Sequence, residues 1–522
     1  MMQLLSIDYD IDNIIIVIKY VAFYLATYFT LKHTILRSKV KGKLPPRPFL
    51  SVPIIGHLYL FKKPLYRSLA RLAAKYGPAL YLRMGARSVL LLSSPEAIEE
   101  CLVKNDVFVD RPRLLPGKHG GNNYTNMAWS PYGKHWKNLR RIAAVEILSP
   151  QRLQILSGIR TEVARSFIRR MIKDITENGG IVEMKSAIFG LTLDNMMRML
   201  IGKSNYVEAR GGMEASRRFQ KTMEGSFRVS GVNNLEDFLP ILKYFRVFLG
   251  SPEEFMKKLT KERNTFMQGL MLEHRELERV GNLSDGRKRA MIHVLLSLQK
   301  EDPQYYSDEM IGSLILALFQ GGTDTSAATV EWVLSLLLNN PKVLKKAQEE
   351  IDTNVGNTRL VEESDKNNLP YLQCIINETL RMYPTGPLGL PRESRGDCYV
   401  GGYYVPKGSM LIYNIWAVHN DPNIWDDPRN FKPERFLDLE KTTLGYKFMP
   451  FGTGKRVCPG EHLANKMIWL AVAILIQCFD WERTSNDLID MEESGGLSLV
   501  KLVPLCVKCG LRPCMMNVLS QL

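Results

Sequence analysis

One short segment near the C-terminal end of the chain restricts its fold more than any other. Residues Phe451–Gly460 read FGTGKRVCPG, so Cys458 lies in a glycine-rich loop directly before an apolar run of helical character. A cysteine that ligates a metal does so as a thiolate, and backbone N–H groups and the positive end of a following helix stabilise that charge. The segment therefore predicts a thiolate ligand at Cys458. The alternative is a buried structural cysteine after a turn.

Five positions of this segment form a longer pattern, Phe-x-x-Gly-x-Arg-x-Cys-x-Gly. At average residue frequencies a chain of this length contains it by chance on the order of once in ten thousand sequences. The pattern is the signature of the cytochrome P-450 superfamily, which this chain resembles. The resemblance implies that Cys458 is the axial thiolate of haem b, the electron-rich ligand that favours cleavage of the O–O bond. It also implies that Phe451 and Arg456 lie beside the haem.

The composition fits a globular protein and argues against several other classes. The chain has 522 residues, of which 45% are apolar and 24% charged, and a net charge of +15. The basic residues are dispersed, and no zinc-finger, homeodomain or RNA-binding signature accompanies them, so we expect no nucleic-acid partner. An acidic protein partner or an anionic membrane surface explains the charge better. The eight cysteines are scattered, so neither a disulfide framework nor a zinc site is expected.

The N-terminal region predicts a single membrane anchor at residues 13–31. This stretch is apolar except for Lys19, and about 20 such residues span a bilayer. Positive charges follow the segment and aspartates precede it, which places residues 1–12 in the lumen and later residues in the cytosol. Residues 32–53 form a basic, proline-rich hinge, and 54–522 form the catalytic domain. The alternative is that Lys19 makes the segment lie on the membrane surface. Resemblance to microsomal members of the family implies the endoplasmic reticulum.

The rest of the chain is predominantly helical. Leu65–Lys75 is amphipathic, and two β-rich runs, the second at Ser88–Ser93, predict a small sheet. Residues Phe108–Asn126 are rich in Gly, Pro and Asn and predict a long surface loop. The expected fold class is mainly α with a small β-rich lobe, the haem-thiolate fold implied by the resemblance, behind the N-terminal anchor.

A long helix is predicted from Ser307 to about Asn339, and its middle breaks the local rules for helices. The sequence GGTDTS at residues 321–326 places two glycines and an aspartate inside it. The glycines cost about 2 kcal/mol relative to alanine, and such breaks commonly mark functional sites. The family motif matches here at every position. It implies that Thr325 hydrogen-bonds dioxygen and that Asp324 controls proton access. The alternative is a simple packing kink.

The resemblance also assigns residues that hold the haem and brace its loop. Trp136 and Arg140 are spaced i, i+4 on one helix face, and the family hydrogen-bonds both to a haem propionate. Lys134, Lys137 and Arg141 fall on the opposite face, either as a docking surface for an acidic electron donor or as an ordinary solvated face. Arg392 is expected to reach a propionate as well; a solvated arginine in a surface turn is the alternative.

A charged triad and the walls of a substrate pocket complete the set. Glu378 and Arg381 lie one helical turn apart, and Arg435 joins them in the family as a structural brace for the cysteine loop. The predicted pocket residues are Phe319, Gly321, Gly322, Thr385, Leu388 and Leu390. A hairpin tip at Ser494–Val500 is expected to enter the same pocket.

Three further segments, Lys43–Pro46 (KLPP), Asn123–Thr125 (NYT) and Phe448–Gly452 (FMPFG), resemble the plant microsomal A-type branch, and within it the chain is most similar to the group of isoflavone 2′-hydroxylases. The resemblance implies a monooxygenase. Electrons would come from NADPH through NADPH–cytochrome P-450 reductase, with cytochrome b5 as an additional donor. The expected substrate is a lipophilic plant metabolite hydroxylated on an aromatic ring: a flavonoid or isoflavonoid, a lignan, a xanthone or an aromatic abietane diterpenoid. One alternative is a haem-thiolate enzyme that rearranges its substrate or forms a methylenedioxy bridge. Another is a non-enzymatic membrane haem-binding protein, in which the acid–alcohol pair at residues 324–325 would have no purpose.

Overall fold

The computed structural model describes most of the chain. Its described residues are 19–20, 27, 42–48, 50–203, 222, 225, 234–245, 252–283, 290–437, 444–496 and 498–522. The predicted membrane anchor at residues 13–31 lies outside the described residues except at Lys19, Tyr20 and Thr27. Over the part of the chain that is described, no helix combines the length and the apolar character needed to cross a membrane.

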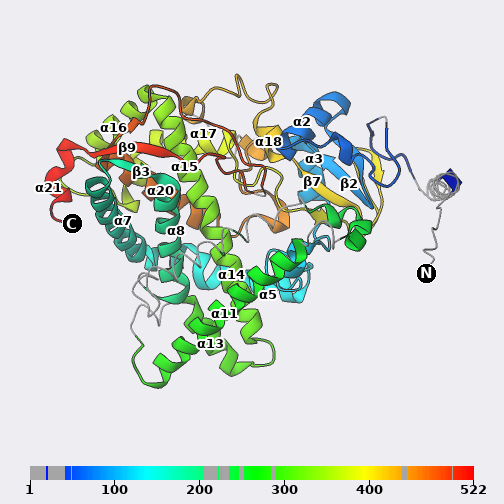
Figure 1. Ribbon diagram of the computed structural model, residues 1–522, viewed down its shortest axis with the longest axis horizontal. Helices are drawn as coiled ribbons and strands as arrows, with labels where there is room; N and C mark the ends of the chain where they lie inside the picture. Colours follow the sequence, from blue (N-terminus) through cyan, green and yellow to red (C-terminus); the bar gives the residue numbers. More distant parts are fainter. Residues whose placement is uncertain are drawn as a thin grey trace, which may run out of the picture.

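The predicted fold class, mainly helical with a small β-rich lobe, is confirmed. Helices fill the left and centre of Figure 1, and the blue and yellow strands gather on the right. The longer helices are α2 (Leu65–Tyr76), α5 (Lys134–Ala143), α7 (Ser157–Glu177), α8 (Met184–Ile201), α11 (Pro252–Arg279), α13 (Met291–Glu301), α14 (Asp308–Gly322), α15 (Asp324–Asn339), α16 (Pro341–Asn354), α17 (Pro370–Met382) and α20 (Glu461–Cys478). The shorter ones are α3 (Pro95–Glu99), α4 (Leu115–His119), α6 (Pro150–Ile155), α18 (Ile415–His419) and α21 (Met516–Leu519).

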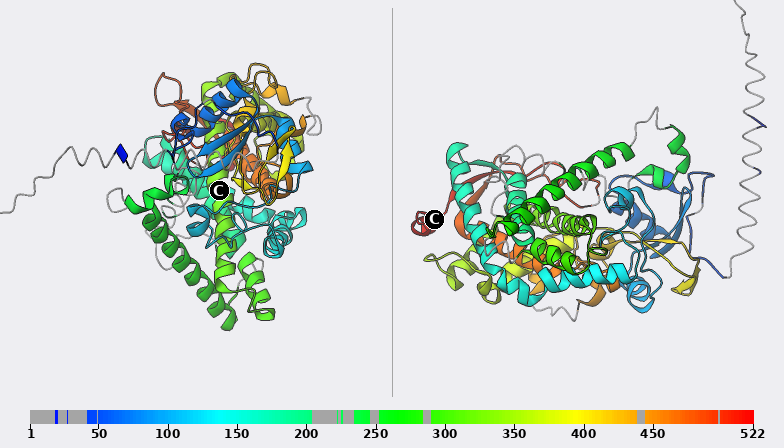
Figure 2. Two further views of the ribbon diagram at one scale, coloured as in Figure 1. Left: turned by 90° about the vertical axis from the view of Figure 1, so that its right-hand side faces the viewer. Right: turned by 90° about the horizontal axis from the view of Figure 1, so that it is seen from below.

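Short 3-10 and π segments connect these helices. They are η1 (Leu58–Leu60), η2 (Glu100–Lys104), η3 (Ala144–Leu148), η4 (Leu235–Asp237), η5 (Pro240–Phe245), η6 (Glu363–Asn368), η7 (Pro433–Phe436), η8 (Gly445–Lys447), η9 (Gly454–Arg456) and η10 (Pro513–Met515). In the side view of Figure 2, as in Figure 1, α11 and α13 project from the lower edge of the molecule.

Three small sheets accompany the helices. Their strands are β1 (Ala79–Met84), β2 (Arg87–Leu92), β3 (Ile181–Glu183), β4 (Arg392–Glu393), β5 (Cys398–Val400), β6 (Tyr403–Val405), β7 (Met410–Tyr413), β8 (Phe479–Arg483) and β9 (Cys506–Leu511). The largest sheet has the order β1-β2-β7-β4, with β2 and β7 parallel and the other pairs antiparallel. In the second sheet β9 pairs with both β3 and β8, and β5 pairs with β6 in the third. The β2–β7 pair joins the N-terminal third of the chain to its C-terminal third.

The continuous apolar run of β2 is explained by burial on both of its faces. Successive side chains of a strand point to opposite sides of a sheet. Leu90 and Leu92 accordingly pack into one core cluster, whereas Val89 and Leu91 pack into another on the opposite face. All four are completely buried. A strand covered on both sides loses the alternation of apolar and polar residues.

The long helix predicted from Ser307 to about Asn339 is present as α14 and α15. The Ser307 hydroxyl caps its start by accepting the N–H of Met310 at 3.2 Å. The two helices are separated only at Thr323, where φ is −90° and ψ is −72°. They run through the middle of the molecule in Figure 1, and α15 packs against α8, α17 and α20. The interruption therefore lies within the core.

Two sequence-based boundaries differ from the structure. The backbone of Lys43 accepts a hydrogen bond from Tyr404, and that of Pro46 accepts one from Tyr81, at 2.8 and 2.9 Å. The globular part therefore begins before the predicted boundary at residue 54. The predicted surface loop at Phe108–Asn126 contains helix α4, and many of its side chains are buried. Its glycines and asparagines serve tight turns inside the fold, which composition alone does not distinguish from a solvated loop.

Candidate active site

The segment around Cys458 folds as a closed loop. The N–H of Cys458 donates to the carbonyl of Phe451 at 3.0 Å, and the N–H of Val457 donates to Gly454 at 2.9 Å. Gly454 has a φ of +72°, and a Cβ there would lie 2.2 Å from the carbonyl oxygen of Leu102. Only glycine fits such a position. Helix α20 begins three residues after Cys458, so the loop lies at its N-terminal end, as predicted.

Cys458 lies deep in the protein, yet its side chain is exposed, as expected for a residue that faces an internal space. Burial raises the pKa of the Cys458 thiol, while the N–H of Gly460 and the charge of Arg140 act to lower it. The Arg140 guanidinium is held nearby because its Nη1 donates to the carbonyl of Val457 at 2.6 Å. The loop therefore presents a single thiol to this space, with one cation beside it.

Three arginines converge close to the cysteine loop. Burial together with the neighbouring charges of Arg456 and Arg392 holds the pKa of Arg111 well below its usual range. Burial, and then the charge of Arg392, lowers the pKa of Arg456 to about 10. Nε and Nη1 of Arg392 and Nη1 of Arg456 are buried and have no hydrogen-bond acceptor among the described residues. Buried N–H groups of like-charged side chains require an anionic acceptor.

The remaining contacts of these arginines fix their orientation. Arg392 donates from Nη2 to the carbonyl of Thr453 at 2.7 Å, and Arg456 donates to the carbonyls of Val109 and Ser130. The Arg456 guanidinium also lies 4.8 Å from the centre of the Trp136 ring. The bonds made by the other nitrogens of the same guanidinium groups thus fix the direction of the open N–H groups.

Trp136 and Arg140 share one face of α5, as predicted, but their polar groups have protein partners. The indole N–H of Trp136 donates to the carbonyl of Met127 at 3.0 Å. Its flat ring is therefore the part that faces Arg456. Hydrogen bonding of Trp136 and Arg140 to a propionate stays a prediction. On the opposite face of α5 the three basic side chains are exposed, namely Lys134, Lys137 and Arg141.

Arg111 is a site residue that the sequence analysis missed. Its Nε donates to the carbonyl of Ala128 at 2.9 Å, and its Nη1 donates to the carbonyls of Leu390 and Pro391 at 2.8 Å each. It therefore joins the segment before α4 to the turn that precedes Arg392. No sequence signal distinguishes it, because an arginine in an irregular segment looks the same whether it is solvated or buried.

The helix interruption lies beside open space. The Thr325 hydroxyl donates to the carbonyl of Gly321 at 2.7 Å, and Asp324 is the half-buried first residue of α15. Gly321 is exposed although Phe319 is fully buried, and a Cβ at Gly321 would meet nothing within 4 Å. A Cβ at Gly322 would instead lie 2.7 Å from the sulfur of Met196. The first glycine thus leaves room at the site, and the second permits packing.

The predicted triad forms a buried network. Arg381 donates from Nε and Nη2 to both carboxylate oxygens of Glu378, at 2.7 and 2.8 Å, and neither side chain is exposed. Arg435 donates from Nε to the same carboxylate at 3.0 Å. Arg381 also donates to the carbonyls of His419 and Pro428. The fully buried Glu378 and Arg381 thus satisfy each other's hydrogen-bonding groups, and the partly buried Arg435 adds a third partner; a bracing role for the cysteine loop stays a prediction.

Comparison with known proteins agrees with this geometry. Residues 45–506 match the sequence model of the family described as cytochrome P450. The chain belongs to the cytochrome P450 family. It is 41% identical to an isoflavone 2′-hydroxylase of Glycyrrhiza echinata, over 98% of this chain and 100% of that protein. It is 42% identical to an isoflavone 3′-hydroxylase of Medicago truncatula, over 94% and 97% of the two chains.

A third relative and a solved structure extend the comparison. A (+)-piperitol/(+)-sesamin synthase of Sesamum radiatum is 41% identical, over 92% of this chain and 93% of that protein. A zebrafish cytochrome P450 solved with progesterone superimposes with a TM-score of 0.74 at 24% identity, covering 86% of this chain and all of that one. The structural likeness shows the fold. The predicted plant branch is confirmed by the sequence relatives.

Membership in the family establishes the enzyme class and the cofactor. This cytochrome P450 is an oxidoreductase, a monooxygenase that uses haem iron and receives electrons from a redox partner reductase. The residues present fit that group. Cys458 offers the thiolate, and the orphaned N–H groups of Arg392 and Arg456 supply donors that suit carboxylates.

The predicted pocket residues of this cytochrome P450 are brought together only in part. Phe319, Gly321 and Gly322 lie at the end of α14, directly before Thr325. Leu388 is buried, and Thr385 and Leu390 are half-buried, in the turn between α17 and β4. The predicted hairpin joins that turn, since the N–H of Leu499 donates to the carbonyl of Thr385 at 2.9 Å. Its flanks pair through an antiparallel bridge between residues 493 and 501.

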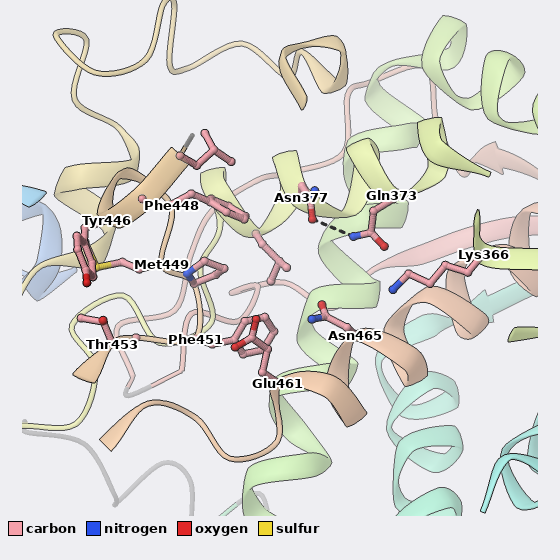
Figure 3. A pocket seen from close by; sticks show the side chains of 15 residues that line it. Lys366, Gln373, Asn377, Tyr446, Phe448, Met449, Phe451, Thr453, Glu461 and Asn465 are labelled. Atoms are coloured by element: carbon pink, nitrogen blue, oxygen red, sulfur yellow. Dashed lines mark hydrogen bonds between the residues drawn. The ribbon is translucent and has the colours of Figure 1, made fainter. Parts of the chain in front are cut away.

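A separate cavity of about 390 Å³ lies between α17, α20 and the segment that leads to the cysteine loop. Figure 3 shows Gln373, Asn377 and Asn465 around one part of it and Phe448, Met449 and Phe451 around another. Gln373 and Asn377 hydrogen-bond each other at 2.9 Å. Phe451, predicted to lie beside the haem, thus forms part of the wall between the cysteine loop and this cavity.

Proposed function

We propose that this cytochrome P450 hydroxylates an aromatic ring of a lipophilic plant metabolite, with isoflavonoids as the leading class. The observation that carries the proposal is the similarity over nearly the whole chain to two isoflavone hydroxylases. Gly321 leaves open space beside Thr325, and the predicted pocket residues Phe319 and Leu388 are apolar, which agrees with an apolar substrate. Lignans, xanthones and aromatic abietane diterpenoids are the further candidate classes.

The proposal assigns each site residue a role. Bound haem supplies the activation of dioxygen. Cys458 would hold the iron as a thiolate, and Arg392 and Arg456 would hold the propionates through their open N–H groups. Thr325 holds a proton at its hydroxyl oxygen, which donates to Gly321 at rest and can rotate toward the open space. Asp324, one residue earlier, exchanges protons with solvent. The triad of Glu378, Arg381 and Arg435 keeps the cysteine loop in place.

The second candidate reaction is closure of a methylenedioxy bridge. It is favoured by the similarity to the (+)-piperitol/(+)-sesamin synthase. The same residues serve either outcome, because the substrate carbon nearest the open space at Gly321 decides which bond is oxidised. Product mass distinguishes them. Hydroxylation adds one oxygen, whereas bridge closure from a methoxyphenol removes two hydrogens.

We also propose that the protein is anchored in the endoplasmic reticulum by residues 13–31, with its catalytic part in the cytosol, where NADPH–cytochrome P450 reductase and cytochrome b5 reach it. The apolar stretch and the positive charges after it support this. Deleting residues 1–31 should release the protein from microsomes after a carbonate wash. Full retention in the membrane pellet would contradict the anchor.

The decisive experiment uses the full chain in microsomes with a plant reductase and NADPH. Flavonoids, isoflavones, lignans, xanthones and abietane diterpenes are supplied one at a time, and products are read by mass. A product one oxygen heavier from an isoflavone supports the proposal. Turnover of a different class alone, with an intact carbon monoxide difference spectrum, overturns the substrate assignment and leaves the enzyme class standing.

A further inference from the structure

Trp332, on the second half of the long helix, contacts both loops that carry predicted pocket residues. Its side chain is completely buried. The indole N–H donates to the carbonyl of Leu499 at 3.0 Å, in the C-terminal hairpin. The ring stacks on Tyr383, with 4.0 Å between ring centres and an angle of 13° between planes. Tyr383 opens the turn that contains Thr385 and Leu388.

The helix ties Trp332 to the oxygen side of the site. Trp332 lies seven residues after Thr325, so the two side chains project from nearly the same face of α15, two turns apart. Between them, the Thr329 hydroxyl donates to the carbonyl of Thr325 at 2.9 Å. A displacement of the hairpin against α15 therefore changes the distance between the pocket wall and Thr325.

The neighbouring residue, Glu331, holds the chain a few residues beyond the same hairpin. Its side chain is buried, and Oε1 accepts the N–H of Leu505 at 2.9 Å. On the near side, the N–H of Leu499 donates to the carbonyl of Thr385 at 2.9 Å. Two adjacent residues of one helix thus hold the backbone on both sides of Lys501. Leu499 also connects the helix to the 383–391 turn, because its carbonyl accepts from Trp332 and its N–H donates to Thr385.

Lys501 lies over the ring of Trp332. It is buried, its ammonium lies 5.0 Å from the centre of the Trp332 ring, and it donates to the carbonyl of Asp490. A cation over a tryptophan face is attracted to the ring. Leu388 and Leu499 belong to the same core cluster as Trp332. The indole is therefore enclosed by Lys501, the 494–500 hairpin and the 383–391 turn, and its contacts determine how the hairpin and the turn lie relative to each other.

We propose that Trp332 is a positioning residue for substrate specificity, which sets the shape of the pocket by fixing the 494–500 hairpin and the 383–391 turn against the helix of Thr325. The proposal rests on the proposed function only in taking these two loops as pocket walls. The hydrogen bond from the indole N–H fixes the distance of the hairpin from α15, and the stacking on Tyr383 fixes the position of the 383–391 turn relative to the same helix. Trp332 itself lies behind both walls, so it acts through Leu499 and Tyr383.

The test compares two buried tryptophans in the haem-loaded full chain. Trp332→Phe keeps an aromatic ring that stacks on Tyr383 but removes the N–H donor. Trp469→Phe is the matched control, because Trp469 is equally buried in α20 and its indole N–H has no hydrogen-bond partner among the described residues. Trp332→Tyr replaces the first variant should that one fail to give holoprotein.

Two readouts need no substrate. Amide hydrogen exchange should become faster in peptides spanning 494–505 in Trp332→Phe and stay unchanged there in Trp469→Phe. Spectral titration with imidazole and 4-phenylimidazole should show a changed preference for the larger ligand. The upper limit is about fivefold, reached if the whole contribution of the lost hydrogen bond appears as a difference in affinity. The preference of Trp469→Phe should equal that of the wild type.

The outcomes separate this inference from the proposed function. Unchanged exchange at 494–505, or equal changes in both tryptophan variants with the ligand preference retained, overturns the role of Trp332. Absence of product from every metabolite supplied contradicts the proposed substrate class and affects neither readout. Where a substrate is found, Trp332→Phe should also alter the ratio of its regioisomeric products, which a residue that only stabilises the fold leaves constant.

Discussion

The backbone N–H of Met449 donates to Nε2 of His419 at 2.9 Å, and this bond connects the buried triad to the segment that leads into the cysteine loop. The carbonyl of His419 accepts the guanidinium of Arg381 at 2.7 Å. The imidazole ring stacks on Phe448, with 5.4 Å between ring centres. His419 thus links Arg381 of the triad to the segment just before the cysteine loop, through its carbonyl on one side and its ring nitrogen on the other. The sequence analysis did not identify it.

Lowering the pH should destabilise the protein through His419. Burial, and then the charge of Arg381, lowers its pKa to about 3, from 6.5 in an unfolded chain. Between these values the unfolded chain binds a proton that the folded one does not, so stability is lost as pH falls from 6.5 toward 3, by about 1.4 kcal/mol per unit. The thermal midpoint measured between pH 6.5 and 5 should show this slope. His419→Asn, which can still accept from Met449, should flatten it.

Breaking the triad should prevent stable haem loading. Glu378→Gln leaves the fully buried Arg381 without its carboxylate, and removal of one partner of a buried ion pair costs about 3–5 kcal/mol. The measurement is the fraction of purified protein that gives the carbon monoxide difference spectrum. The matched control is Lys173→Ala, which breaks an exposed pair with Glu177 in α7. It should change little. Normal loading of Glu378→Gln would contradict the bracing role.

Two glycines in the site should respond in opposite ways to alanine. Gly454→Ala requires a left-handed backbone that costs a residue with a Cβ about 1–2 kcal/mol, and its Cβ would meet the carbonyl of Leu102 at 2.2 Å. Haem content and thermal midpoint should both fall. Gly321→Ala meets open space within a helix, so the midpoint should hold or rise. An equal loss in the two variants would mean that the space beside Gly321 is smaller than described.

Thr325→Ala should separate electron consumption from product formation. The variant removes the hydroxyl that donates to Gly321, which is the group proposed to hold a proton for the reaction. Product per NADPH consumed should fall about a hundredfold, at the low end of what a positioned proton donor contributes, and hydrogen peroxide should rise. Thr325→Ser keeps the hydroxyl and should retain most of the coupling. Full coupling in Thr325→Ala would show that another group delivers the proton.

Local pattern in the sequence predicted the cysteine loop, the interrupted helix and the pairing of Glu378 with Arg381, whereas Arg435 and the fold class followed from the family resemblance that these motifs carry. These features depend on spacing along the chain: glycines where the backbone turns tightly, and Glu378 and Arg381 one helical turn apart. Helix α5 followed from the i, i+4 spacing of Trp136 and Arg140, and β2 followed from a short apolar run between turn residues, because both signals are local in the chain. The family relationship confirmed the fold, the cofactor and the class of reaction that these motifs implied.

Only the tertiary structure decided which long-range partners complete the site. Arg111, His419 and Trp332 looked like ordinary loop, helix and core residues, because their roles come from backbone carbonyls or N–H groups far away in the chain. The composition of Phe108–Asn126 predicts a surface loop, whereas many of its side chains are buried, because glycine and asparagine occur in buried turns and solvated loops alike. The sequence gives the chemical type of each side chain, whereas the packing of segments distant in the chain decides which hydrogen-bond partner that side chain has.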